Sequence, residues 1–297
     1  MNKMVFEGVC TAAITPFTKD GIDFNALGKQ IEFQIAGGVS ALCILGTTGE
    51  APTITDEEYS EIAKFSYDKI AGRVKFILGT GSNCTKKAVE KSVLAEKLGA
   101  DGLLVVTPYY NKCTQNGLIK YYNDVCDSVN IPVLCYNVPA RTGVNILPET
   151  MARIAEHKNV GGIKEACGNM EQICETARLI KGKTALYSGD DNLNLAMLAI
   201  GSKGLISVVS NVLPKEVSMV NALFNAGKTA EANALHEKLL PAIDVMFCEV
   251  NPIPVKKAAY LLGLDSGIVR APLTELEPEH TKEMINILKS LGLTVKE

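Results

Sequence analysis

A lysine stands near the end of a short apolar segment, residues 160–166, whose sequence is VGGIKEA. The two-residue alternation of a β-strand places Gly162 and Lys164 on one face of this segment and Ile163 on the other. Apolar surroundings favour the neutral amine, the nucleophilic form that makes Schiff bases with carbonyl compounds. A surface lysine at a strand end is the alternative interpretation, but lysine is rarely buried without a functional reason. We therefore predict that Lys164 is a Schiff-base nucleophile.

Tyrosines stand at the ends of two other apolar segments. Tyr136 lies in PVLCYNVPARTG, residues 132–143, one segment before Lys164. Neighbouring strands are about 5 Å apart, so the Tyr136 hydroxyl could move protons at the substrate of the lysine. A tyrosine that only packs within its strand is the alternative. Tyr109 and Tyr110 are adjacent in TPYYNK, a pairing that is typical of a subunit interface.

Two further segments carry groups that bind carboxylates. In the GTTGE loop, residues 46–50, the glycines allow close backbone approach, and Thr47 and Thr48 offer hydroxyl and N–H groups. Arg141 follows the Tyr136 segment and could hold a second carboxylate through paired hydrogen bonds. A tight turn and a solvated arginine are the corresponding structural alternatives. We predict that these two segments bind the acidic groups of small substrates.

A metal site is not expected. The turn SGDD, residues 188–191, carries Asp190 and Asp191, but adjacent carboxylates at a helix start more often cap the helix. The same acidic turn argues against a phosphorylated substrate. The nine cysteines include no Cys-x-x-Cys pair and are expected to be reduced, mostly buried thiols. The three histidines are far apart in sequence: His157, His236 and His280.

Eight apolar runs rich in Val, Ile and Leu predict the strands that position these residues. They alternate with amphipathic helical stretches, and the first run lacks a Gly-x-Gly-x-x-Gly turn, so a (β/α)8 barrel is favoured over an open sheet. Active sites of this fold lie at the C-terminal ends of the strands. The predicted strands are residues 8–17, 40–46, 74–81, 102–110, 132–139, 160–166, 184–190 and 204–211. The predicted helices include residues 55–72, 85–99, 148–158 and 170–182.

The strand pattern stops near residue 226, and the rest of the chain has only helical periodicity. We therefore predict a catalytic barrel over residues 1–226 and a helical extension over residues 227–297. The extension is expected to serve assembly more than chemistry, with Asn251 and Lys256 framing the site.

The composition is that of a globular protein. The chain has 297 residues, of which 47% are hydrophobic and 21% charged, and its net charge is −3. This balance gives no basic surface for a nucleic acid. The longest apolar stretches are far shorter than the ~20 residues that span a membrane. The first ten residues show no signal sequence, so we expect a cytoplasmic protein.

These motifs, in this order, resemble those of the pyruvate-dependent class I aldolases. The resemblance covers essentially the whole chain and includes TPF, GTTGE, TPYYN, YNVPARTG, GIKEA, SGDD, GLISV and NPIPVK. It is greatest to members that condense pyruvate with aspartate semialdehyde to the heterocyclic precursor of diaminopimelate and lysine. A lyase for sialic acid or keto-deoxy sugar acids is the alternative, but such relatives usually lack an arginine at the place of Arg141. An inactive ligand-sensing barrel is a third hypothesis.

The resemblance implies roles for the reacting groups. Lys164 would form an imine with pyruvate and then an enamine, with no metal or organic cofactor. Tyr136 would donate and accept protons. Thr47 would relay protons between Tyr136 and Tyr110, which would reach in from a neighbouring subunit.

The resemblance also implies how the substrates are held and how subunits assemble. Thr48, Gly189 and the backbone around Ile206 would bind pyruvate, and Arg141 would bind the carboxylate of the semialdehyde. The usual assembly in this family is a homotetramer built from two tight dimers.

One motif departs from the family pattern. Lysine-inhibited members carry histidines or a tryptophan after GTTGE, and a glutamate four residues beyond an asparagine. Here APTITDEEY follows GTTGE, and Lys87 stands four residues after Asn83. A lysine side chain repels a lysine ligand where a carboxylate would pair with it. We therefore expect inhibition by lysine to be weak or absent.

Overall fold

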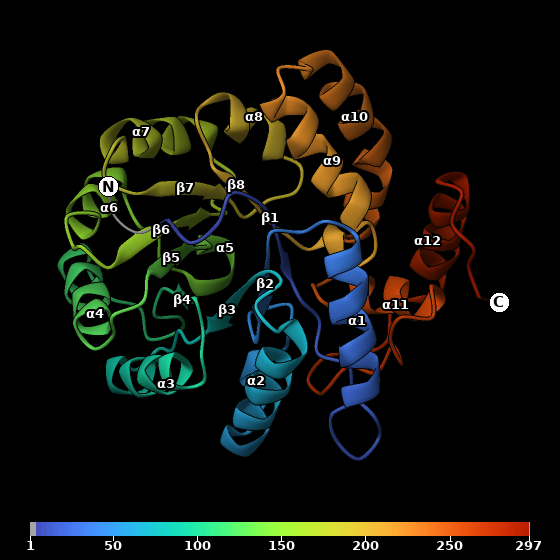
Figure 1. Cartoon of the computed structure of the whole chain (residues 1–297), viewed down its shortest axis with the longest axis horizontal. Helices are drawn as coiled ribbons and strands as arrows, with labels where there is room; N and C mark the ends of the chain where they lie inside the picture. The colour runs from blue at the N-terminus through green and yellow to red at the C-terminus, as the bar shows by residue number, and fades with distance from the viewer. Residues whose placement is uncertain (1–3, 297) are drawn as a thin grey trace.

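Eight parallel strands pair in chain order, and the last pairs with the first to close a barrel (Figure 1). The computed structural model describes residues 4–296. The predicted fold class, a (β/α)8 barrel with a C-terminal helical extension, is confirmed. The strands are β1 (Gly8–Ala12), β2 (Ala41–Ile44), β3 (Lys75–Gly79), β4 (Gly102–Val106), β5 (Val133–Asn137), β6 (Val160–Glu165), β7 (Ala185–Ser188) and β8 (Gly204–Ser207).

Helices surround the barrel and continue beyond it (Figure 1). Around the strands lie α1 (Phe24–Ala36), α2 (Asp56–Ile70), α3 (Thr85–Lys97), α4 (Gln115–Asp127), α5 (Pro139–Thr142), α6 (Pro148–Ile154), α7 (Met170–Ile180), α8 (Asn194–Ala199) and α9 (Pro214–Asn225). Two 3-10 turns, η1 (Ala51–Thr53) and η2 (Val209–Asn211), follow β2 and β8. The extension comprises α10 (Thr229–Val245), α11 (Ile253–Leu261) and α12 (Pro278–Ser290). Helix α2 begins with the capping box expected from the sequence, formed by Thr55 and Glu58.

Each strand is shorter than the apolar run that predicts it. The clearest case is β1, which ends at Ala12 although its run continues to residue 17. The Ile14 N–H donates to the Asn211 side chain at 3.0 Å instead of to a strand. The extra apolar residues therefore belong to the loops at the C-terminal end of the barrel.

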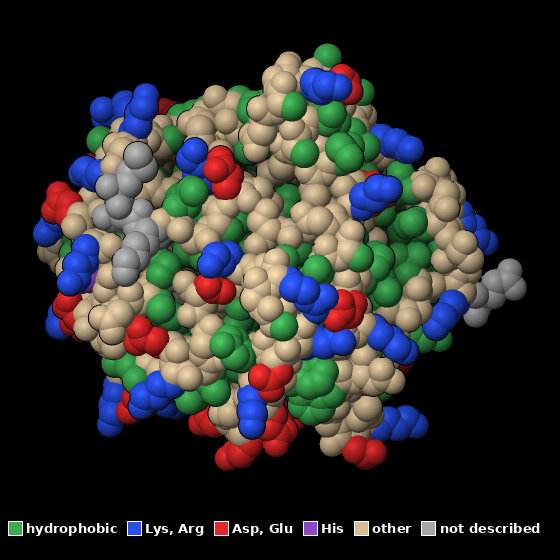
Figure 2. All heavy atoms as spheres, viewed as in Figure 1, with side chains coloured by type: hydrophobic (Ala, Val, Ile, Leu, Met, Phe, Trp, Pro, Cys, Tyr) green, Lys and Arg blue, Asp and Glu red, His purple; other side chains and the backbone are tan. Residues whose placement is uncertain are grey.

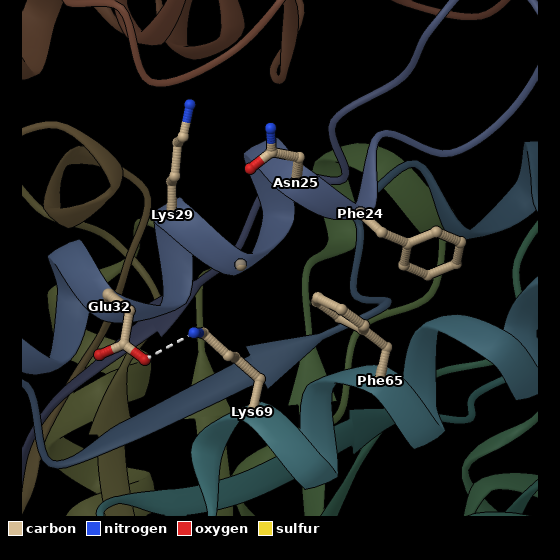
Figure 3. Close-up of a pocket in the computed structure, with 7 residues that line it drawn as sticks. Phe24, Asn25, Lys29, Glu32, Phe65 and Lys69 are labelled. Atoms are coloured by element: carbon tan, nitrogen blue, oxygen red, sulfur yellow. Dashed lines mark ion pairs between the residues drawn. The ribbon is translucent and has the colours of Figure 1, made fainter.

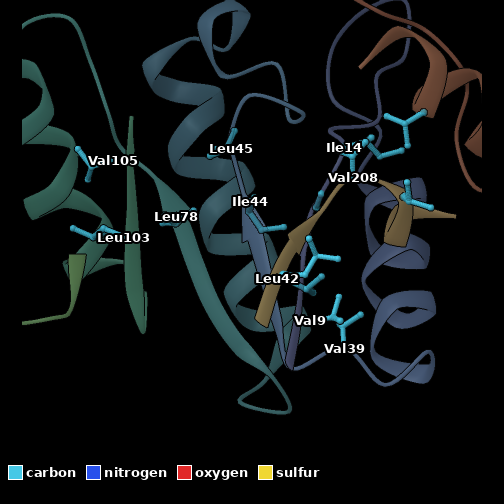
Figure 4. Packing of buried hydrophobic residues seen from close by; sticks show 14 of the residues in the cluster. Val9, Ile14, Val39, Leu42, Ile44, Leu45, Leu78, Leu103, Val105 and Val208 are labelled. Atoms are coloured by element: carbon cyan, nitrogen blue, oxygen red, sulfur yellow. The ribbon is translucent and has the colours of Figure 1, made fainter. Parts of the chain in front are cut away.

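Apolar side chains pack in two layers. The outer layer fills the space between strands and helices, as shown for Leu42, Ile44 and Leu78 in Figure 4. The inner layer lies inside the barrel and includes Tyr187. At the N-terminal end of the strands, Tyr187 stacks on Phe6 with ring centroids 4.4 Å apart, and its hydroxyl donates to the Phe6 carbonyl at 2.7 Å. This pair belongs to the buried cluster inside the barrel at that end.

The cysteines are all free thiols in the described residues, but their burial is uneven. The expectation of burial holds for Cys10, Cys43, Cys126 and Cys135. It is wrong for Cys84 and Cys174, which are exposed, and the remaining three are partly exposed. Burial raises the pKa of Cys43 to about 11, so this thiol is protonated at neutral pH.

The extension packs along one side of the barrel beside α1 and α9 (Figure 1). The predicted boundary at residue 226 falls between the end of α9 and the start of α10, and the division into two domains stays a prediction. None of the helices within residues 4–296 has the length and apolar character needed to span a bilayer. Basic and acidic side chains are interspersed over the face shown in Figure 2.

An ion pair attaches α12 to the loop before α11. His280 Nδ1 lies 2.6 Å from Glu249 Oε1, and this contact raises the pKa of His280 above its usual value. A histidine with a raised folded-state pKa stabilises the fold below its unfolded pKa of about 6.5 and loses that effect as pH rises through the folded value. We expect His280→Gln to lower the melting temperature slightly at pH 5.5 and less at pH 9. Thermal unfolding at both pH values checks this, and an equal loss at both would contradict it.

Candidate active site

Lys164 lies inside the barrel near the C-terminal end of β6. Its side chain is 5% exposed, and its Nζ lies 4.3 Å from the centroid of the Tyr136 ring. The two residues are register partners on β5 and β6, which explains the contact. The structure therefore brings the predicted nucleophile and the predicted proton carrier together.

Gly189 gives the lysine its space. A Cβ at this position would lie 2.9 Å from Cε and Cγ of Lys164 and from Cβ of Ala166. Contacts that short do not occur, so any larger residue would displace the aliphatic stem of Lys164. The Gly189 N–H also donates to the Glu165 carbonyl at 2.8 Å, which fixes the turn after β7 against β6.

A polar cluster on the outer face of the barrel connects the two strands that carry this pair. Asn137 Nδ2 donates to Glu165 Oε1 at 3.0 Å, and Asn137 Oδ1 accepts from the Ile146 N–H at 2.9 Å. The Cys167 N–H donates to the Glu165 carboxylate at 2.9 Å. Burial raises the pKa of Glu165 despite these donors. Sequence reasoning missed this cluster, although strand alternation does place Glu165 opposite Lys164.

The GTTGE loop places its two threonines differently. Thr48 is buried, and its Oγ1 accepts a hydrogen bond from Asn251 Nδ2 at 3.0 Å. Thr47 lines the cavity described next. The Thr15 hydroxyl donates to the Gly49 carbonyl at 2.7 Å, which ties the loop to the segment after β1. Arg141 Nη2 donates to the Asn251 carbonyl at 3.2 Å, so Asn251 contacts both predicted carboxylate-binding segments.

A cavity of about 410 Å³ opens beside these loops. Thr47, Tyr136 and Arg141 line it together, in agreement with their predicted position at one end of the barrel. Lys87 and Lys91, both on α3, also line it. The cavity wall therefore carries hydroxyl and phenol groups together with three cationic side chains.

Tyr110 does not reach this cavity in its own chain. It is 90% exposed and has a φ of 71°, an unusual backbone conformation for a residue other than glycine. Its neighbour Tyr109 lines the cavity instead. Within residues 4–296, no hydrogen bond joins the hydroxyls of Thr47, Tyr136 and Tyr110.

The acidic turn after β7 has a structural use. Asp191 is buried and accepts from the Ser207 hydroxyl and from the Val208 N–H, the latter at 2.9 Å. Burial raises the pKa of Asp191 to about 6. The Asp190 carboxylate accepts from the Asn192 N–H at 3.0 Å. Asp191 thereby fixes the end of β8 next to Ile206, which is itself buried in the barrel interior.

Within residues 4–296, no group of three or more His, Cys, Asp or Glu side chains is placed to hold a metal ion. A hollow of about 520 Å³ lies between α1 and α2, where Phe24 faces Phe65 and Lys69 pairs with Glu32 at 3.1 Å (Figure 3). It contains none of the residues predicted to react or to bind substrate.

A family model and a curated relative both match nearly the whole chain. Residues 5–291 match the model of the dihydrodipicolinate synthetase family. A 4-hydroxy-tetrahydrodipicolinate synthase from Methanocaldococcus jannaschii is 46% identical over 291 residues, which cover 97% of this chain and 100% of that protein. The similarity thus includes the extension as well as the barrel.

Two solved structures of similar proteins superpose on nearly the whole chain. Dihydrodipicolinate synthase from Aquifex aeolicus superposes with a TM-score of 0.96 at 42% identity, covering 98% of this chain and 100% of that one. A structure described as the first monomeric dihydrodipicolinate synthase variant has a TM-score of 0.96 at 41% identity and covers 97% and 98% of the two chains.

Proposed function

The chain belongs to the dihydrodipicolinate synthetase family, and from that premise we propose that Lys164 carries its reaction as an imine with pyruvate. The reaction is the condensation of pyruvate with aspartate semialdehyde on the diaminopimelate route to lysine, which makes the chain a lyase-class enzyme. Enzymes of this family need no metal or organic cofactor. Neither the sugar-acid lyase nor the inactive sensor agrees with the relatives found. The observation that carries the proposal is the burial of Lys164 against Tyr136 beside the cavity.

The chemistry follows from the lysine amine. The amine attacks the C2 carbonyl of pyruvate, and loss of one water gives the imine. The protonated imine withdraws electrons from C3, so a C3 proton leaves and an enamine forms. C3 then bonds to the aldehyde carbon of the semialdehyde, whose oxygen takes up a proton. Attack of the semialdehyde's amino group on C2 closes the ring and releases Lys164 as the free amine.

The proton transfers are assigned to Tyr136, which is adjacent to the lysine. Its ring already lies 4.3 Å from Lys164 Nζ, and Thr47 lines the same cavity. Thr47 would pass protons between Tyr136 and the Tyr110 of a neighbouring copy. The 90% exposure of Tyr110 supports a position in another protomer's cavity. We propose a homotetramer of two tight dimers, and because a monomeric relative exists, sedimentation must establish the assembly.

The substrate carboxylates are assigned to two neighbouring regions. Thr48, Gly189 and the backbone around Ile206 would hold pyruvate below the cavity, near Lys164. Arg141 would hold the semialdehyde carboxylate, and its bond to the Asn251 carbonyl orients the guanidinium. Neither nucleic acid nor membrane is expected as a partner, and a cytoplasmic location remains a prediction.

Reductive trapping tests the proposal. The protein is incubated with pyruvate and borohydride, digested, and analysed by peptide mass spectrometry. A stable pyruvate adduct on the peptide that contains Lys164 is expected. Absence of an adduct, or an adduct on another lysine only, would refute the imine as assigned.

Inhibition by lysine is expected to be weak or absent. Lys87 and Asn83 line the cavity near Tyr109, and a second cation, Lys91, lies beside them. Their positive charges oppose the binding of a cationic amino acid. Activity should stay above half its starting value in millimolar lysine, measured at fixed pyruvate and semialdehyde. Strong inhibition in that range would disprove the expectation, and Lys87→Glu should increase whatever inhibition remains.

A further inference from the structure

A fully buried lysine from the extension contacts the catalytic end of the barrel. Lys256, on α11, has a side chain that is 0% exposed. Its Nζ donates to Glu50 Oε1 at 2.9 Å and to the Thr15 carbonyl at 2.8 Å. It also lies 4.1 Å from the centroid of the Phe17 ring. The two side-chain hydrogen bonds of Lys256 that the structure shows are therefore both with the barrel.

Glu50 is the last residue of the GTTGE loop, and the segments that follow the barrel hold both of its oxygens. Oε1 accepts from Lys256, and Oε2 accepts from the Arg270 N–H at 2.9 Å. Glu50 has a left-handed φ of 54°, so the chain turns sharply just after the two threonines. The Glu50 N–H donates to the Thr47 carbonyl at 3.1 Å within the loop, and the two carboxylate contacts hold the same turn from outside.

Thr15 completes the connection. Its carbonyl accepts from Lys256, and its hydroxyl donates to the Gly49 carbonyl at 2.7 Å. Lys256 is therefore linked to the loop at two successive residues, Gly49 through Thr15 and Glu50 directly. A shift of the lysine would move the backbone that presents Thr47 and Thr48.

Attachment of the extension does not explain the ion pair. Helix α11 already buries Val255, Ala258 and Ala259 in the apolar layer around the barrel. A buried ion pair adds little to stability compared with well-packed apolar side chains. Burial lowers the pKa of Lys256, opposed by the charges of Asp265 and Glu50. In the part of the chain described, Lys256 forms no hydrogen bond with Asp265. Its side chain bonds instead to Glu50 of the loop and to the Thr15 carbonyl.

We propose that Lys256 is a positioning residue for the condensation, which fixes the GTTGE loop through Glu50 so that Thr47 and Thr48 face the pyruvate imine. The inference rests on the proposed function of those threonines. It gives the extension a part in the reaction as well as in assembly. Misplacement of reacting groups by about 1 Å can cost about 100-fold in rate, so the effect is measurable.

The test compares Lys256→Met with the matched control Lys257→Met, its neighbour on α11, which lies 5.3 Å from the Tyr260 ring. We expect Lys256→Met to lower kcat/KM for pyruvate by about 30-fold or more. KM for the semialdehyde should change by less than about threefold, because Arg141 forms its hydrogen bond with the Asn251 carbonyl and none with Lys256 or Glu50. Lys257→Met should behave like the unsubstituted protein. Unchanged kinetics in a folded Lys256→Met protein would overturn the proposal.

A double variant separates positioning from a merely structural effect. Glu50→Gln combined with Lys256→Met removes both buried charges and is expected to recover melting temperature but not kcat/KM for pyruvate. Recovery of kinetics together with melting temperature would overturn the proposal, and this comparison remains valid if Lys256→Met alone does not fold. Borohydride trapping of the unsubstituted protein tests the imine independently, so failure of the proposed function is distinguished from failure of this inference.

Discussion

Lys164→Met is expected to lower kcat for the condensation by about 10⁴-fold or more, because it removes the amine that is proposed to form the imine beside Tyr136. Methionine keeps an apolar stem of similar length beside Gly189 while removing the amine. The barrel should therefore remain folded. The measurement is the steady-state rate at saturating pyruvate and semialdehyde, with circular dichroism and thermal unfolding as checks of the fold.

Lys164→Arg is the matched control for charge. The guanidinium of arginine stays protonated, so it carries a permanent positive charge in the pocket and is not a nucleophile at neutral pH. Both variants should fail to form a pyruvate adduct under borohydride. A rate above about 1% of the original in a folded Lys164→Met protein would be incompatible with nucleophilic catalysis by this lysine.

Tyr136→Phe is expected to lower kcat by about 10²- to 10³-fold, the usual contribution of one positioned acid–base group. Phenylalanine keeps the ring beside Lys164 Nζ and removes only the hydroxyl. Pyruvate should still be trapped on Lys164, although more slowly, because the nucleophile is intact. The result is measured by steady-state kinetics and by the time course of trapping.

Tyr59→Phe provides the comparison for this effect. Tyr59 lines the same cavity, but its hydroxyl donates to the Gly79 carbonyl at 3.3 Å and has no assigned part in the reaction. Its loss should change kcat by less than about threefold, as expected for one partly buried neutral hydrogen bond. If the two variants behave alike, Tyr136 is not the proton carrier.

The barrel could be predicted because its strands leave a strong local pattern. Strands buried on both faces are continuous runs of Val, Ile and Leu, and helix starts such as Thr55 with Glu58 carry their own cap. Active sites of this fold lie at one end of the strands, so the position of Lys164 beside Tyr136 could be predicted as well. The ends of the strands could not be predicted. An apolar run continues past the residue where the backbone stops bonding to the neighbouring strand and bonds to a side chain instead, as it does at Ile14.

The contacts that hold the site could not be predicted in the same way. Asn251 and Thr48 are separated by 203 residues, and Lys256 and Glu50 by 206. Their meeting depends on how the extension packs on the barrel, which no local pattern encodes. The left-handed backbone of Tyr110 could not be predicted either, since tyrosine itself disfavours that conformation.

The stacked pair of Phe6 and Tyr187 has a consequence for traffic through the enzyme. The pair packs inside the N-terminal end of the barrel, so we expect small molecules to reach Lys164 from the opposite end, beside the cavity. In the proposed mechanism pyruvate reacts with Lys164 before the semialdehyde does, so both substrates would use this one end in turn. The product ring would then leave by the same end before the next pyruvate binds.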